Sequence, residues 1–186
     1  MNYIQTEIDG VWIIEPKIFF DPRGYFMEAF KQQEFDATIG QINFIQDNES
    51  QSSFGTLRGL HYQKGAYSQA KLVRVIKGEV LDVAVDLRKS SPTFGKHISV
   101  LLSDENKRQL FIPRGFAHGF LVKSEIAIFT YKVDNIYAPN LRLLSYTMIR
   151  HWLSTGLLPI LNLSCQRKTS RQEPFGKQNI LNRNPQ

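Results

Sequence analysis

The sequence predicts an all-β fold, an antiparallel sandwich or barrel made of short strands. Three observations support this class. Within the first 140 residues, short β-type segments alternate with Gly and Pro turn signals. Along residues 79–87 the side chains alternate between two sets, with Leu81, Val83 and Val85 in one of them, which is the period of a strand with two distinct faces. Helical periodicity is nearly absent, and many short strands between such turns are typical of sandwiches and barrels.

The individual elements follow in chain order. A short helix is expected at residues 30–39, before the main run of strands. The strands are expected at residues 72–76, 79–87, 97–102, 110–112, 120–122 and 126–133. Turns at Lys77-Gly78 and Phe94-Gly95 separate the first of these strands, and residues 113–119 are expected to form a loop between two others.

Length and composition indicate one globular domain without a membrane segment. The chain has 186 residues, of which 42% are hydrophobic, and no apolar run approaches the length needed to span a bilayer. Residues 1–12 lack the basic flank and apolar core of a signal peptide. The single cysteine, Cys165, cannot form an internal disulfide. We therefore expect a cytoplasmic protein with no membrane partner.

The net charge of +6 is confined to the end of the chain. Residues 1–140 contain 16 acidic and 16 basic side chains, whereas residues 141–186 contain seven basic ones and a single acid, Glu173. A nucleic-acid groove needs Lys and Arg clustered on a folded face, so we expect no nucleic-acid partner. The chain divides into a domain at residues 1–140 and an atypical basic tail at residues 141–186, which we expect to be irregular and partly disordered.

Four polar clusters carry the candidate chemistry. They are residues 21–28 (DPRGYFME), 46–50 (QDNES), 57–63 (LRGLHYQ, with Lys71 soon after) and 112–120 (IPRGFAHGF, with Tyr131 on the next strand). Together with residues 83–92 (VAVDLRKSSP) and 131–139 (YKVDNIYAP), they resemble the dTDP-4-dehydrorhamnose 3,5-epimerase family over about residues 4–140. This resemblance implies a cupin-like double-stranded β-helix (jelly roll), a homodimer, a dTDP-4-keto-deoxysugar substrate, and chemistry without a cofactor.

A 4-keto sugar has acidic hydrogens at C3 and C5, because removing either gives an enolate that is delocalised onto the C4 oxygen. Epimerisation therefore needs a base on one face, an acid on the other, and cationic or hydrogen-bonding groups at that oxygen. By the resemblance, His61 is the base, Tyr131 is the acid and Lys71 holds the developing oxyanion. Substrate-binding roles are implied for Arg23 and Arg58, which would hold the diphosphate, and for Glu28, Gln46, Asn48 and His118.

Structural interpretations remain open for several of these residues. Tyr131 could be a half-buried strand tyrosine with its hydroxyl at the surface. His118 could serve only as a hydrogen-bond partner of Asp82, its expected neighbour. Strict alternation puts Arg58 and His61 on opposite faces of one strand, so both reach a single pocket only if the strand has a bulge near Gly59.

A metal-binding cupin is the nearest alternative in fold. The spacing Pro113-x-Gly115-x-x-His118 is similar to a cupin motif whose histidine is often a ligand. The partner motif would then offer a His-x-His pair, but this chain has His61-Tyr62-Gln63. About three nitrogen or carboxylate ligands are needed for a tight site, so we expect no bound metal.

The resemblance ends near Asn140. The family places a glutamate where Arg142 stands, and an aspartate further on partners the catalytic histidine, yet no aspartate follows Asp134. We interpret this as a reading-frame shift near Asn140. Two alternative functions stay open: a single-centre epimerase or ketoisomerase of another dTDP-deoxysugar, and a catalytically impaired sugar-nucleotide-binding protein.

Overall fold

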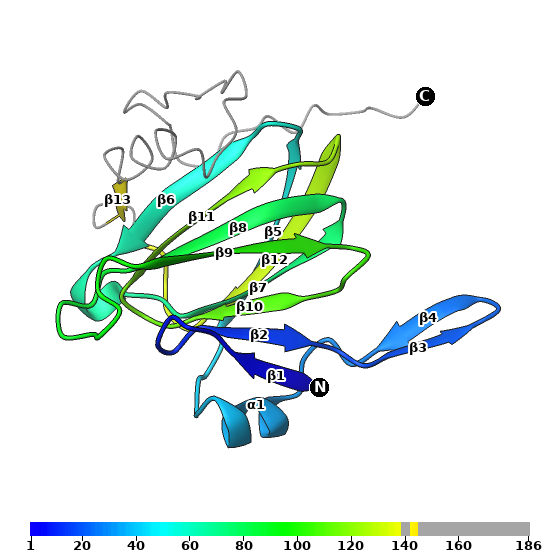
Figure 1. The fold of residues 1–186 in the computed structure, drawn as a ribbon, viewed down its shortest axis with the longest axis horizontal. Coiled ribbons are helices and arrows are strands. Elements are labelled where there is room, and N and C mark those ends of the chain that lie inside the picture. Colours follow the sequence, from blue (N-terminus) through cyan, green and yellow to red (C-terminus); the bar gives the residue numbers. More distant parts are fainter. Residues whose placement is uncertain (139–141, 145–186) are drawn as a thin grey trace, which may run out of the picture.

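The computed structural model describes residues 1–138 and 142–144. Within these residues two antiparallel sheets face each other, and a two-stranded hairpin extends from the body (Figure 1). The strands are β1 (Asn2–Gln5), β2 (Trp12–Glu15), β3 (Ile18–Asp21), β4 (Gly24–Met27), β5 (Gln46–Ser53), β6 (Leu57–Gln63), β7 (Lys71–Lys77), β8 (Glu79–Asp86), β9 (His97–Ser103), β10 (Gln109–Ile112), β11 (Phe116–Val122), β12 (Ile126–Val133) and β13 (Arg142–Leu144). The six-stranded sheet has the order β1-β2-β10-β7-β12-β5, and the five-stranded sheet has the order β13-β6-β11-β8-β9.

This architecture confirms the expected all-β class and its cupin-like jelly-roll arrangement. The expected short helix is present as α1 (Gln32–Thr38), and a 3-10 turn, η1, covers Gly65–Tyr67. No helix of the described residues is long and apolar enough to cross a membrane. Apart from β13, the tail predicted at residues 141–186 lies outside the described residues, so its irregular character stays a prediction.

The loop expected at residues 113–119 is shorter in the structure than predicted. Strand β11 begins at Phe116, so His118 lies within the strand and not in a loop. The reason is burial: Phe116 and Ala117 are both part of the apolar interior, and the strand is hydrogen-bonded to β8 along its whole length. Gly119, which suggested a turn, instead allows the backbone of β6 to approach closely.

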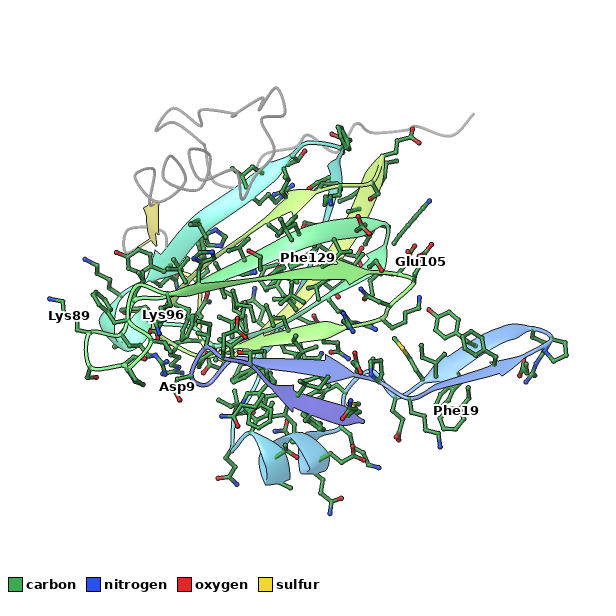
Figure 2. All side chains as sticks on the ribbon, in the orientation of Figure 1. Asp9, Phe19, Lys89, Lys96, Glu105 and Phe129 are labelled. Carbon is green, nitrogen blue, oxygen red and sulfur yellow. The ribbon has the colours of Figure 1, made fainter. Side chains whose placement is uncertain are left out.

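The main hydrophobic core lies between the two sheets. It contains Val73 and Phe129 from the six-stranded sheet and Ala84 and Phe120 from the five-stranded one, and Figure 2 shows Phe129 in this interior. The alternation predicted along β8 is confirmed, because Val80 and Ala84 face this core while the other set packs in a separate cluster on the opposite side of the sheet. The inner surfaces of the two sheets are therefore the walls of the barrel.

A second apolar layer covers the outer side of the six-stranded sheet beside α1. Phe35 of the helix is fully buried, and its ring packs edge-on against Phe111 of β10 at a centroid distance of 5.2 Å. Phe30 and Phe44, which flank the helix, complete this aromatic cluster. The helix thus packs against the outer face of the six-stranded sheet and contributes no side chain to the core between the two sheets.

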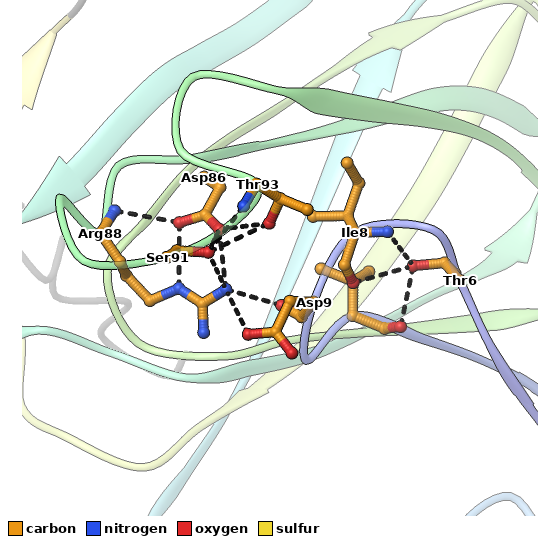
Figure 3. A network of polar contacts seen from close by, with 8 residues as sticks. Thr6, Ile8, Asp9, Asp86, Arg88, Ser91 and Thr93 are labelled. Carbon is orange, nitrogen blue, oxygen red and sulfur yellow. Dashed lines mark hydrogen bonds and ion pairs between the residues drawn. The ribbon is translucent and has the colours of Figure 1, made fainter.

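A polar network fastens the end of β8 to the N-terminal segment (Figure 3). The carboxylate of Asp86 is fully buried and accepts hydrogen bonds from Arg88, Ser91 and Thr93. Burial tends to raise the pKa of Asp86, but these hydrogen bonds outweigh it and hold the pKa well below its ordinary value. Arg88 also donates a hydrogen bond of 2.7 Å to the backbone carbonyl oxygen of Asp9 and forms an ion pair of 3.1 Å with the Asp9 carboxylate, so it joins two distant parts of the chain.

The β3–β4 hairpin projects away from both sheets (Figure 1). Four aromatic side chains on it are exposed, and Phe19, labelled in Figure 2, lies far from the barrel. Phe20 is 78% exposed and Phe26 is 66% exposed. An isolated two-stranded hairpin is only marginally stable, so such an apolar surface on a projecting arm indicates a partner.

Candidate active site

A histidine and a lysine from facing sheets meet between the two sheets. His61 lies on β6 of the five-stranded sheet, and Lys71 is the first residue of β7 in the other sheet. The Nζ of Lys71 lies 3.4 Å from the Nε2 of His61, and Lys71 is only 7% exposed. The tautomer of His61 sets the direction of this contact: when Lys71 is an ammonium group it can only donate, and Nε2 is then the unprotonated ring nitrogen. That nitrogen is the one able to accept a proton.

The bulge expected near Gly59 is present. His61 pairs with His118 of β11 and Arg58 pairs with Phe120, so two residues of β6 oppose one residue of β11 between these pairs. Gly59 has a φ of 126° at this point. Because the extra residue offsets the alternation by one, Arg58 and His61 point to the same inner face.

Arg58 reaches across the barrel to the edge strand of the opposite sheet. Its Nε donates a hydrogen bond of 2.8 Å to the Oγ of Ser52 on β5, and Ser52 is buried. This bond fixes the direction of the guanidinium group. Sequence reasoning missed Ser52, because every residue of β5 is polar and the pattern therefore does not distinguish the inner face from the outer one.

Tyr131 shares this inner surface. It lies on β12 and packs against the main core, and in the sheet it is opposite Asn48 of β5 and Val73 of β7. Lys71, two residues before Val73, is therefore its diagonal neighbour on the same face. Gln46 is also on this side of β5 and donates a hydrogen bond of 2.6 Å to the side chain of Asn48. Neither His61 nor Tyr131 is fully buried.

His118 lies deeper than His61 and is paired with a buried acid. Its Nε2 is 3.0 Å and 2.9 Å from the two carboxylate oxygens of Asp82, which is fully buried on β8. The expected neighbourhood of these two residues is thus confirmed. The ring centroids of His118 and His61 are 6.2 Å apart in an edge-on arrangement, and Phe129 stacks against His118 at a centroid distance of 6.3 Å.

Two of the expected substrate-binding residues lie outside the inner surface that carries the others. Arg23 is at the tip of the projecting hairpin, where its side chain is 89% exposed and forms an ion pair of 2.7 Å with Asp21. Glu28 follows the hairpin and lies 3.9 Å from Lys31. The fold of a single chain therefore brings together His61, Lys71, Tyr131, Arg58, Gln46, Asn48 and His118, but not these two. Sequence spacing gave no indication that the hairpin would extend outward.

The described part of the chain offers no cluster of three or more His, Cys, Asp or Glu side chains suited to a metal ion. His118 faces a single carboxylate there, that of Asp82. The expected absence of a metal therefore remains an expectation.

Comparison with known proteins decides the family. The sequence model described as dTDP-4-dehydrorhamnose 3,5-epimerase matches residues 5–150. The dTDP-4-dehydrorhamnose 3,5-epimerase of Shigella flexneri is 60% identical over 139 residues, which are 74% of this chain and 77% of that protein. This chain belongs to the dTDP-4-dehydrorhamnose 3,5-epimerase family. The expected extent of the resemblance, about three quarters of the chain, is confirmed.

Solved structures of related epimerases share the fold. The dTDP-6-deoxy-D-glucose-3,5-epimerase of Legionella pneumophila, in complex with dTDP-4-keto-L-rhamnose, is 52% identical and superposes with a TM-score of 0.74 over 77% of this chain and 76% of that one. A 3'-monoepimerase of Streptomyces bikiniensis, in complex with dTDP-quinovose, is 33% identical with a TM-score of 0.72 over 76% of this chain and 72% of that one. The same barrel therefore occurs with two kinds of epimerisation.

Proposed function

We propose that this chain epimerises C3 and C5 of dTDP-4-dehydro-6-deoxy-D-glucose, giving dTDP-4-dehydro-L-rhamnose in dTDP-rhamnose biosynthesis. The enzyme is an isomerase that works by proton transfer. One observation carries the proposal: His61 and Lys71 meet at 3.4 Å on the inner surface that also holds Tyr131. A base, a cation and a phenol on one inner surface are the three groups that an enolate mechanism needs.

Each centre is inverted in two proton transfers. The Nε2 of His61 takes the proton from C3 or C5, and the electron pair of the broken C–H bond moves into the enolate and onto the C4 oxygen. Lys71 stabilises that oxygen with its positive charge. The hydroxyl of Tyr131 then gives a proton to the same carbon from the opposite face. Solvent returns a proton to Tyr131 and removes one from His61, so atoms and electrons balance and the reaction requires no redox cofactor.

Binding of the diphosphate is assigned to Arg58. Its guanidinium crosses the barrel and is anchored on Ser52, which leaves further N–H groups for paired phosphate oxygens. Asn48 and Gln46 lie on the same edge strand and supply hydrogen bonds to the sugar nucleotide. The single cysteine of the chain fits a reducing compartment, which supports a cytoplasmic location.

The test is deuterium incorporation from D2O, followed by mass spectrometry of the sugar nucleotide. We expect two deuterium atoms in the product, one from each inverted centre, and no incorporation with His61→Asn. Binding of dTDP without any incorporation would refute the epimerase proposal and select a binding protein in its place.

A single-centre epimerase is the second candidate. The likeness to the 3'-monoepimerase favours it, because that protein has the same barrel. Incorporation of a single deuterium atom per sugar nucleotide, even after incorporation has reached its plateau, would select this alternative.

The projecting hairpin supports a homodimer in which each chain completes the site of the other. Arg23 and Glu28 match substrate-binding positions of the family but lie away from the barrel of their own chain. The exposed aromatic surface of the hairpin needs a partner, and a second copy offers one that also has a substrate cavity. We propose that the hairpin of one chain reaches the barrel opening of its partner.

Mixing two inactive variants tests this arrangement. In a mixed dimer of Arg23→Ala and His61→Ala chains, one barrel would combine an intact His61 with the partner's intact Arg23. We therefore expect epimerisation to return when the two variants are refolded together. If Arg23 acts within its own chain, each barrel of the mixed dimer stays defective and no activity returns.

A further inference from the structure

The pairing of Asp82 with His118 controls which nitrogen of the imidazole is available. Both recorded hydrogen bonds of His118 use Nε2, and both go to Asp82. A carboxylate only accepts hydrogen bonds, so Nε2 must carry the proton. In the neutral ring Nδ1 is then an acceptor, and the choice of tautomer is set by the acid.

The order of the strands places the ring between the acid and the base. Strand β11 lies between β6, which carries His61, and β8, which carries Asp82. The ring of His61 lies edge-on to that of His118 at a centroid distance of 6.2 Å, so the ring that Asp82 holds also lies beside His61. Packing reinforces this orientation, because Phe129 covers one side of the His118 ring at an interplanar angle of 25°.

Full burial of Asp82 makes this contact costly to lose. A carboxylate with no solvent exposure requires a hydrogen-bonding or charged partner, and the imidazole supplies it through both oxygens. A side chain held in this way has little orientational freedom. By fixing the orientation of such a partner, a buried acid affects a reaction without contacting the substrate itself.

We propose that Asp82 is a positioning residue of the epimerase reaction: it holds Nε2 of His118 so that Nδ1 is presented beside His61 as a hydrogen-bond acceptor for a hydroxyl of the bound sugar. The inference rests on the function proposed above. His118 thereby fixes the position of the sugar ring relative to His61. Asp82 sets the direction in which the Nδ1 of His118 points.

The decisive variant is Asp82→Asn, which keeps the shape but removes the charge and allows the amide to donate as well as accept. Asp86→Asn is a matched control, since Asp86 is equally buried and lies on the same strand, but its carboxylate accepts hydrogen bonds from Arg88, Ser91 and Thr93 instead of from His118. We expect kcat to fall about 10- to 100-fold in Asp82→Asn, with dTDP affinity retained, because dTDP lacks the sugar. The control should keep kcat within about twofold once its lower stability is allowed for.

Nitrogen NMR of histidine-labelled protein gives a readout that a purely structural role would not change. In the wild type the signal of His118, assigned with a His118→Gln variant, should report the Nε2–H tautomer, and a substrate-like sugar nucleotide should shift Nδ1. Asp82→Asn should mix the tautomers, while Asp86→Asn should not. A wild-type Nδ1–H tautomer, or unchanged kcat in a folded Asp82→Asn protein, would overturn the proposal. If the wild type itself shows no deuterium incorporation, the proposed function fails, and the NMR comparison alone decides the role of Asp82.

Discussion

Replacing Gly59 with alanine should damage the site through the backbone of β6. A Cβ atom at this position would lie 2.5 Å from the Cα of Gly119 and 2.7 Å from the carbonyl oxygen of His118. Both neighbours belong to the main chain of β11, so no side chain can turn aside to make room. The two strands must therefore separate at the bulge that directs Arg58 and His61 to the same inner face.

The magnitude has two parts. A φ of 126° is unfavourable for any residue with a Cβ atom, which costs about 1–3 kcal/mol. Forcing the strands apart costs a further amount of about 1–3 kcal/mol, typical of overpacking in a tight interior. Together these give an expected loss of unfolding free energy of about 2–6 kcal/mol. A displacement of His61 by about 1 Å should also lower the turnover about 100-fold.

Gly55→Ala is the matched control. Gly55 has a φ of 74°, but a Cβ there meets nothing within 4 Å. It should show the conformational cost alone, with the deuterium incorporation rate unchanged. Urea unfolding and D2O incorporation of both variants measure the difference. Equal stability and equal incorporation rates for the two variants would refute the argument that close approach at Gly59 shapes the site.

Three other predictions concern stability, binding and the tail. Because the pKa of Asp86 is lowered in the folded chain, its ionised form stabilises the fold above about pH 4, and this contribution is lost as the pH falls further. Asp86→Asn should thus cost about 3 kcal/mol at pH 7 and clearly less at pH 3 in urea titrations, and an equal loss at both would contradict this. Ser52→Ala, which frees Arg58, should weaken dTDP binding about tenfold in calorimetry, whereas Ser53→Ala on the outer face should not. Replacing the residues after Asn140 with the C-terminal sequence of a family member should raise kcat about 100-fold or more with little change in dTDP affinity. Fresh sequencing across that codon that shows an intact frame would rule out the frame shift.

Much of the fold could be predicted because strand patterns are local. The alternation along β8 follows from the geometry of a single strand, and the structure confirms which side chains face the core. The start of β11 was missed because Gly115 and Gly119 suggested turns. The choice between a turn and a strand there depends on pairing with β8, which is distant in the sequence.

One part of the candidate site was predictable because it follows from the alternation of side chains along a single strand, β6. Since alternation separates Arg58 from His61, a bulge at the intervening glycine was required, and it is present. The contact between Arg58 and Ser52 joins two sheets and has no local signal. For Arg23, a turn motif defines the hairpin but not its direction, which depends on surfaces outside the chain.

The account depends most on proton transfer from two sides of the sugar. Tyr131→Phe removes the acid and keeps His61, so the base can still remove a proton and return a deuteron from the same side. In D2O, we predict that this variant labels the starting sugar nucleotide with deuterium while forming almost no inverted product, as read by NMR of the recovered sugar. Inversion at the wild-type rate in this variant would contradict the assignment of the two faces.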